Sequence, residues 1–343
     1  DSQMERYQEH LISVIADTVR QAKNNSKKST ASVALTEVHD VAFNRRIKLT
    51  DGRTVNNLDY IDSGDIRSAG PVDPSATAVF FENDAQVTGA LVNFTLHATV
   101  LNEDNPLITR DYPGYVVDYV SEQVPGNPPV LFLNGAFGNI NQIGTPGTWI
   151  STFEEAKRIG EAIGEKVVTA YSDRKNVTPV PVVSQHAIIN VVHKQPDPEK
   201  DGFSSLKEVK ERIRDLSIQC EESDDANYRY RFAKDIQFLK EAAHLVEMEP
   251  TEPAEVHVIN VGDIEMVALP GEVFVEYGLK LKESSKNPYS IVCGNTNGSI
   301  GYVPTKEAFD EGAYETRISL GSRVASDTGE KLMQEVDRLR KAI

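Results

Sequence analysis

The sequence predicts an α/β fold in which helices flank a mixed β-sheet in layers. Short apolar segments of strand length alternate along the chain with longer segments whose apolar residues recur at helical spacing. This order of strands and helices is typical of layered α/β domains. Residues 200–250 are strongly charged and show helical spacing only, so they predict a helical hairpin inserted into the domain. We therefore expect residues 1–343 to form one domain that contains this insertion.

The first half of the chain contains both kinds of segment. Residues 4–22 place apolar side chains at four-residue spacing, which predicts an amphipathic helix. Further helices are expected from Asp111 onward and over residues 152–171. Segments rich in Val, Phe, Leu and Thr predict strands over 31–41, 76–81, 87–97 and 130–133. Residues 53–75 are polar and rich in Gly and Pro, so they predict a loop.

The second half continues the alternation on both sides of the charged insertion. Strands are expected over 180–192 and 289–293, and a strand pair over 256–269 turns at Gly262-Asp263. Helices are expected over 272–282 and 326–342, with a Gly–Asn loop over 294–301.

Composition excludes some classes of function. The formal net charge is -16 and the pI is about 4.9, whereas nucleic-acid binders need a basic face, so we expect no nucleic-acid partner. No run reaches the ~18–20 apolar residues of a membrane span, so no transmembrane segment is expected. The two cysteines are too few for a disulfide framework and lack zinc-type spacing.

The best place to look for a reaction site is the segment from residue 93 to residue 144. It contains a strand that ends on His97, a helix, a second apolar strand and a Gly–Asn-rich turn with Asn139 and Asn141. Ligands of open α/β sheets bind beyond the carboxyl ends of strands. However, a lone histidine at a strand end is more often a hydrogen-bonded core residue, and asparagines commonly shape turns.

Other polar residues have an equally simple structural interpretation. Glu272 lies at the expected start of a helix, where its carboxylate would complement the helix dipole. Tyr302 and Tyr314 lie close to the Gly–Asn loop in the sequence. Tyrosines in such positions commonly pack through the ring and keep their own hydroxyl in water. Asp111 is suited to cap its helix. Taken singly, these residues indicate only an α/β protein whose site is not identified.

Taken together and in order, short motifs change this interpretation. HAT at 97–99 is followed by DYPGY at 111–115, GNIN at 138–141, LPGE at 269–272 and GYVPT at 301–305, with YE at 314–315. This series resembles the neutral/alkaline non-lysosomal ceramidase family, particularly its short bacterial members. The resemblance extends from about NRR at 44–46 to Tyr314. It implies a zinc-dependent hydrolase that cleaves an amide.

The resemblance also implies roles for individual residues. His97, Glu272 and Tyr302 match metal ligands of the family, and this mixed N and O donor set suits zinc. Zinc lowers the pKa of a bound water to roughly 7 and so makes a nucleophile available at neutral pH. Tyr314 matches a tyrosine that donates to the developing oxyanion. Arg45 or Arg46 matches an arginine near the site, and the motif does not choose between them.

Three departures from the family pattern affect these expectations. The family's first metal histidine lies in an upstream segment that has no counterpart here. We therefore expect that this chain lacks the N-terminal part of the family domain and one ligand, or that another piece supplies that part. Asn141 stands where the ceramidases have a serine, which argues against a covalent nucleophile and against ceramide as the substrate. The chain also leaves no room for the immunoglobulin-like domain of the long ceramidases.

The resulting expectation is a zinc hydrolase that acts on a small-molecule or lipid-like amide, with Tyr314, Asn141 and Arg45 around the substrate. The alternative is a non-catalytic, ligand-binding relative that keeps the scaffold of the site. Relatives are often exported, so the resemblance implies a secreted or periplasmic protein. The substrate, the oligomeric state and the role of the hairpin stay open.

Overall fold

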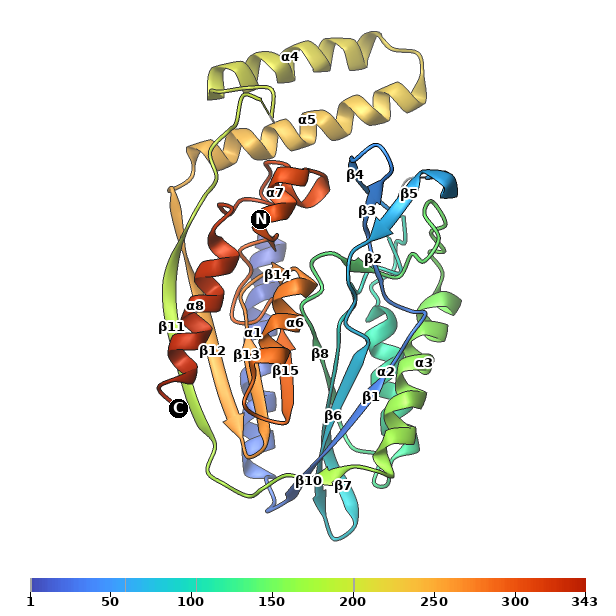
Figure 1. Ribbon diagram of the computed structural model, residues 1–343, viewed down its shortest axis with the longest axis vertical. Helices are drawn as coiled ribbons and strands as arrows, with labels where there is room; N and C mark the ends of the chain where they lie inside the picture. The colour runs from blue at the N-terminus through green and yellow to red at the C-terminus, as the bar shows by residue number, and fades with distance from the viewer. Residues whose placement is uncertain (1, 59, 103, 200) are drawn as a thin grey trace.

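The protein is described by a computed structural model that covers residues 2–58, 60–102, 104–199 and 201–343. Two β-sheets stack face to face, and a helical layer covers the outer face of each (Figure 1). The α/β class and the layered arrangement expected from the sequence are confirmed. The strands are divided between two main sheets, where the sequence pattern had suggested one.

The first sheet has the strand order β10-β1-β6-β7-β8 and is antiparallel except for the β7–β8 pair. Its strands are β1 (Thr30–Glu37), β6 (Ser75–Asn83), β7 (Gln86–Phe94), β8 (Val130–Asn134) and β10 (Lys175–Asn176). Helices α2 (Asp111–Gln123) and α3 (Phe153–Tyr171) cover one face of this sheet.

The second sheet has the order β11-β12-β13-β15, with only the β13–β15 pair parallel. Its strands are β11 (Val183–Val192), β12 (Thr251–Val261), β13 (Ile264–Ala268) and β15 (Tyr289–Cys293). Helices α6 (Val275–Ser284) and α8 (Thr328–Arg340) cover its outer face. A shared core joins the two sheets, formed by residues such as Val79, Ile264 and Ile291.

Helix α3 shows how the sequence pattern becomes a packed layer. The residues Ala156, Ile159, Ile163 and Val167 recur at helical spacing and are fully buried against the first sheet. The Thr152 hydroxyl accepts from the backbone N–H of Glu155 and caps the helix. A methyl group at Gly160 would lie 2.6 Å from the carbonyl oxygen of Tyr112, so glycine permits the close approach of α2.

Short strand pairs at one end of the two sheets carry most of the residues of interest. They are β2 (Phe43–Asn44) with β9 (Ile140–Asn141), β14 (Glu272–Val273) with β16 (Tyr302–Val303), and β3 (Arg46–Leu49) between β4 (Thr54–Asn56) and β5 (Ile66–Ala69). The short helix α7 (Lys306–Glu311) and the 3₁₀ turns η1 (Ser63–Asp65) and η2 (Tyr314–Thr316) complete this region.

Three helices lie outside the two sheets and their covering layers. The predicted hairpin consists of α4 (Leu206–Glu222) and α5 (Ala226–Glu247), which lie across the upper end of the molecule over α7 (Figure 1). It packs through its own small core, to which Ile318 of the body contributes. Helix α1 (Ser2–Asn24) forms as expected, but its apolar residues, among them Leu11 and Ile15, stay exposed.

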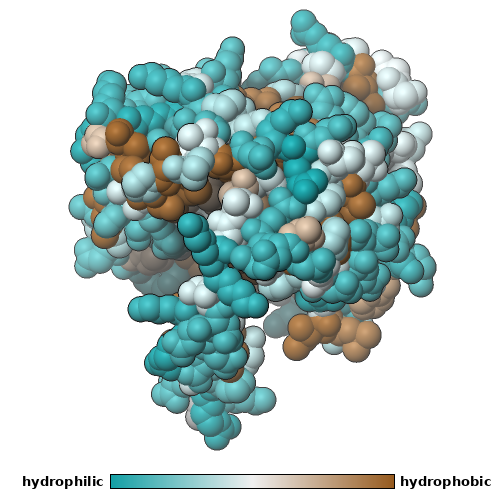
Figure 2. All heavy atoms as spheres, turned by 90° about the horizontal axis from the view of Figure 1, so that it is seen from below, coloured by the Kyte–Doolittle hydropathy of each residue, from teal (hydrophilic) through white to brown (hydrophobic). Residues whose placement is uncertain are grey.

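Seen from the end opposite the hairpin, the surface is mainly hydrophilic with separate apolar patches (Figure 2). None of the helices in the described part of the chain is long and apolar enough to cross a membrane.

The structure corrects several boundaries. Residues 53–75 were expected to be a loop, but they contain β4, η1 and β5. Strand β7 ends at Phe94, so His97 lies beyond the strand and not on its last residue. Glu272 does not begin a helix: it lies on β14, and α6 starts at Val275. The helix-dipole interpretation of Glu272 is therefore wrong.

Candidate active site

The residues matched to the metal ligands converge at the end of the two sheets. Glu272 and Tyr302 are directly opposite each other in the parallel β14–β16 pair, so their side chains lie on the same face of it. His97 follows β7 and reaches this point from the first sheet, with its ring centroid 6.3 Å from that of Tyr302. The tertiary fold thus brings together three residues that are far apart in the sequence.

The imidazole of His97 has an oxygen acceptor at each ring nitrogen. Its Nδ1 lies 2.8 Å from the carbonyl oxygen of Ile140, and its Nε2 lies 2.9 Å from Oε2 of Glu272. A neutral imidazole has only one N–H to donate. One of the two contacts therefore requires an additional positive charge, either a second proton or a cation held between the nitrogen and the carboxylate.

One feature of His97 is typical of metal-ligating histidines. Metal-ligating histidines usually donate the other ring N–H to a carbonyl or carboxylate, as Nδ1 of His97 would to Ile140. The ring is buried and packs edge-on against Phe137 at 4.7 Å, which holds its orientation. Among the described residues, however, no group of three or more His, Cys, Asp and Glu could hold a metal ion. A third ligand from these residues would have to be another type, such as Tyr302.

Arg45 lies against both tyrosines of the site. Its guanidinium carbon is 5.2 Å from the ring centroid of Tyr302 and 5.5 Å from that of Tyr314, and the two tyrosine rings are 5.7 Å apart. Burial raises the pKa of Tyr302 well above its ordinary value and also raises that of Tyr314, whereas the charge of Arg45 acts in the opposite direction. Both phenols therefore keep their protons at neutral pH, which suits Tyr314 to donate a hydrogen bond.

The sequence left Arg45 and Arg46 as alternatives, and the structure separates them. Arg46 points away from the tyrosines: its Nη1 donates to Glu315 and to the Gly312 carbonyl, and its guanidinium lies over the ring of Phe274. The side chain beside Tyr302 and Tyr314 is that of Arg45.

Glu315 is a residue of this site that sequence reasoning missed. It is fully buried and accepts from Nε of Arg45 at 2.7 Å and from Nη1 of Arg46 at 2.9 Å. Burial would raise the pKa of Glu315, but the charges of Arg45 and Arg46 outweigh burial and hold it below its ordinary value. The only available signal was its place directly after Tyr314, since burial of a glutamate is not visible in local sequence.

The GNIN turn positions the site through its backbone and amides. A methyl group at Gly138 would lie 2.2 Å from the carbonyl oxygen of Glu272, so only glycine lets this turn approach β14. The side chain of Asn139 accepts from the backbone N–H of Val275 and donates to Glu276, which caps the start of α6. The Gly138 carbonyl also accepts from Nη2 of Arg45.

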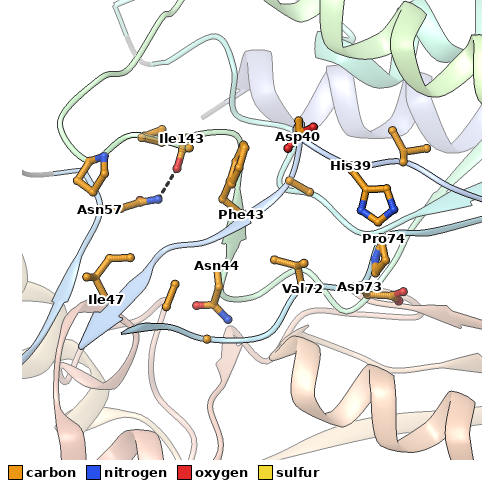
Figure 3. Close-up of a pocket in the computed structure, with 16 residues that line it drawn as sticks. His39, Asp40, Phe43, Asn44, Ile47, Asn57, Val72, Asp73, Pro74 and Ile143 are labelled. Carbon is orange, nitrogen blue, oxygen red and sulfur yellow. Dashed lines mark hydrogen bonds between the residues drawn. The ribbon is translucent and has the colours of Figure 1, made fainter. Parts of the chain in front are cut away.

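Asn141 is buried in a reciprocal amide pair. Its Nδ2 donates to Oδ1 of Asn57 at 2.8 Å, and its Oδ1 accepts from Nδ2 of Asn57 and from the backbone N–H of Ile143. These contacts favour the interpretation that Asn141 shapes the turn, while a substrate contact stays a prediction. A pocket of about 240 Å³ lies beside this region, with Asn57 and Ile143 in its wall (Figure 3). None of His97, Glu272 or Tyr302 is among its lining residues.

The DYPGY motif has a supporting position. Asp111 adopts a positive φ of 50° as the first residue of α2, and its carboxylate accepts from the backbone N–H groups of Leu101 and Tyr112. The hydroxyl of Tyr112 donates to the carbonyl of Leu96, which directly precedes His97. The motif therefore fixes the loop that carries the histidine.

Comparison with known proteins supports the same architecture. No protein-family model and no curated protein matches the chain by sequence. Among solved structures, neutral ceramidase from Pseudomonas aeruginosa is similar with a TM-score of 0.63 and 16% identity over 95% of this chain. A structure described as a ceramidase complexed with C2 is similar with a TM-score of 0.59 and 15% identity over 92% of it. The chain spans only 54% and 53% of these two proteins. At such low identity the likeness concerns the fold, and the chain has a ceramidase-like fold.

Proposed function

We propose that the protein is a zinc-dependent hydrolase that cleaves an amide bond. The observation that carries the proposal is the contact between Nε2 of His97 and the Glu272 carboxylate, because it needs a cation or an extra proton between two acceptors. Tyr302 would supply a third, oxygen ligand from the same face of β14–β16. The ceramidase-like fold supports an amide as the bond cleaved.

Each residue around the metal position would have a distinct role. His97, Glu272 and Tyr302 would hold zinc, which when bound supplies a Lewis acid and a water nucleophile of lowered pKa. Tyr314 would donate its phenolic proton in a hydrogen bond to the carbonyl oxygen as negative charge develops there. Arg45, held by Glu315 and the Gly138 carbonyl, would keep both tyrosine rings in place and add positive charge beside them.

The reaction would proceed without a covalent acyl intermediate. The ceramidase resemblance places Asn141 where a serine is expected, and an asparagine amide has no hydroxyl to act as a nucleophile. Moreover, both Oδ1 and Nδ2 of Asn141 form hydrogen bonds with the side chain of Asn57. A lipid-like amide is the substrate class suggested by the two ceramidases of similar fold.

The metal site can be tested with a matched pair of variants. The protein is equilibrated with zinc and desalted, and zinc is measured by elemental analysis; release of free acid from N-acyl amides is then followed by mass spectrometry. We expect about one equivalent of zinc in the parent protein and loss of both zinc and hydrolysis in His97→Gln. His39→Gln is the control, because His39 and Glu37 form a similar pair, with 3.1 Å between Nε2 and Oε2, on the exposed surface. Equal zinc contents in the two variants would contradict the proposal.

The second candidate function is non-catalytic binding of an amide-bearing ligand. It is favoured by the absence, within the described residues, of a cluster of three or more His, Cys, Asp and Glu. Catalytic zinc sites normally use three protein ligands. This alternative would be established if the parent protein binds N-acyl amides while it neither binds zinc nor hydrolyses the amides.

A further inference from the structure

A second, larger cavity lies under the α4–α5 hairpin. It has a volume of about 1020 Å³ and is lined by residues of α5, α7, β4 and the segment that precedes the hairpin. We call it the hairpin cavity. Its walls include the aromatic residues Phe238, Phe309 and Tyr314, the basic residues Lys194, Lys306 and Arg317, and the acidic residues Asp197, Asp201, Asp310 and Glu311.

Tyr314 connects the hairpin cavity to the candidate active site. Its ring lies 5.7 Å from that of Tyr302 on one side and 6.3 Å from that of Phe238, on α5, on the other. The side chain is 45% exposed and lines the cavity. A substrate whose carbonyl oxygen accepts from Tyr314 would therefore extend directly into this space.

Lys194 is a half-buried cation in the wall of the hairpin cavity. Its Nζ donates to the carbonyl of Thr316 at 2.7 Å and lies 3.3 Å from the hydroxyl of Ser322, and it faces the ring of Phe309. Thr316 belongs to η2, the turn that also carries Tyr314. No carboxylate of the described residues forms an ion pair with Lys194, although Asp201 exerts a longer-range attraction.

Two other charged residues of the cavity, Arg317 and Glu311, already have ion-pair partners. Arg317 donates to Asp235 and lies 4.0 Å above the ring of Phe238, while Glu311 binds Arg46 and Lys48. Burying an ammonium without a counter-charge is costly and lowers the pKa of Lys194 to about 7, so a ligand carboxylate beside its Nζ would favour the protonated form and would gain most at this position. A wall with this many charged groups does not suit a second hydrocarbon chain in addition to the acyl chain of a lipid-like amide.

We propose that the hairpin cavity binds the amine-side part of the amide substrate and that Lys194 pairs there with a carboxylate. The substrate class is then an N-acyl amino acid, in which the carboxylate lies one carbon from the amide nitrogen or further along a short side chain. The identification of an amide rests on the proposed function, whereas the carboxylate site rests on the hairpin cavity alone.

The test compares N-lauroylglycine with N-lauroylglycine methyl ester, which has the same chain without the charge. Binding to the full, metal-free chain is measured by calorimetry, and amide hydrolysis is measured on the zinc-loaded protein. We expect the parent to favour the acid by about 10-fold or more, since hydrogen bonds between charged groups are worth roughly that factor. Lys194→Met should lose this preference while keeping its affinity for the ester. Lys306→Met, at an exposed cation of the same cavity, should keep the preference.

A purely structural role of Lys194 would lower the affinity for the acid and the ester equally, and that result would overturn the inference. Equal affinity of the parent for both ligands would overturn it as well. Lysine-dependent binding of the acid without zinc or hydrolysis would leave the carboxylate site standing while the proposed hydrolase fails. Hydrolysis of both compounds at equal rates would support the hydrolase and contradict the carboxylate site.

Discussion

His97 and Glu272 meet with 2.9 Å between Nε2 and Oε2, although 175 positions separate them in the chain. The opposite ring nitrogen of His97 is bonded to the carbonyl of Ile140, so the imidazole is held between two oxygen atoms. Some residues around this contact would act on the substrate, and others hold these acting residues in position.

Tyr314→Phe should lower kcat by ~10²-fold, the usual effect of losing one oxyanion donor. The substitution keeps the ring contacts with Tyr302 and Phe238 and removes only the hydroxyl. Steady-state kinetics on the zinc-loaded protein provide the measurement. Tyr228→Phe, on the exposed surface of the hairpin, is the control and should leave kcat unchanged. Parent-like turnover in Tyr314→Phe would rule out the oxyanion role.

Glu315→Gln should reduce the free energy of unfolding by roughly 3 kcal/mol or more, because it removes the carboxylate paired with the buried guanidinium of Arg45 and leaves the buried guanidinium of Arg46 with Glu311 alone. Chemical denaturation measures the loss. Asp118→Asn breaks the exposed pair with Arg110 and should cost less than about 1 kcal/mol. Similar losses in the two variants would mean that Glu315 does not neutralise the arginines.

Gly138→Ala should destabilise the protein by about 1–3 kcal/mol, as expected for forcing an atom into a packed site. The new methyl group would lie 2.2 Å from the carbonyl oxygen of Glu272, so we also expect weaker zinc binding. Gly89→Ala is the control: its methyl group would have no neighbour nearer than 4.0 Å. Thermal unfolding and zinc titration of both variants provide the comparison. An unperturbed Gly138→Ala would show that the turn can move away from β14.

Asn141→Ala should lower stability by about 1–3 kcal/mol, because it leaves the buried Oδ1 of Asn57 without its amide donor, while Nδ2 of Asn57 keeps only the Ile143 carbonyl. Asn57→Ala should cost a similar amount, and the double variant should cost less than the sum of the two. Kinetics of the folded fraction distinguish structure from catalysis. If Asn141 contacts substrate, KM should rise in Asn141→Ala well beyond its rise in Asn57→Ala.

Lys194 predicts a stability that increases toward alkaline pH. Burial lowers the pKa of Lys194 from 10.5 to about 7, so between these values the unfolded chain binds a proton that the folded protein does not. The free energy of unfolding contributed by this residue therefore rises from pH 7 to about 10.5. Denaturation across this range in the parent and in Lys194→Met tests the effect, and the variant should lack this rise. A parallel pH dependence of the two proteins would disprove the lowered pKa.

Local sequence was sufficient for most of the architecture. The apolar spacing of residues 152–171 predicted α3, and the β-rich segments on either side of residues 82–84 predicted strands β6 and β7, which form an antiparallel pair. Local sequence failed where elements are too short to show a period. Strand β14 has only two residues, so its pairing with β16 was invisible and Glu272 was assigned to a helix.

The sequence by itself determined the α/β class, the helical hairpin and, through the order of short motifs, a resemblance that placed His97, Glu272, Tyr302 and Tyr314 in one site. The class and the hairpin follow from periodicity and composition, which local segments carry, whereas the site residues were implied by the resemblance alone. Only the tertiary structure decided that Arg45 and not Arg46 faces the tyrosines. It also decided that Glu315 pairs with both arginines and that Asn141 pairs with Asn57. Such contacts join distant segments, and their partners are set by how two sheets stack, which no single segment encodes.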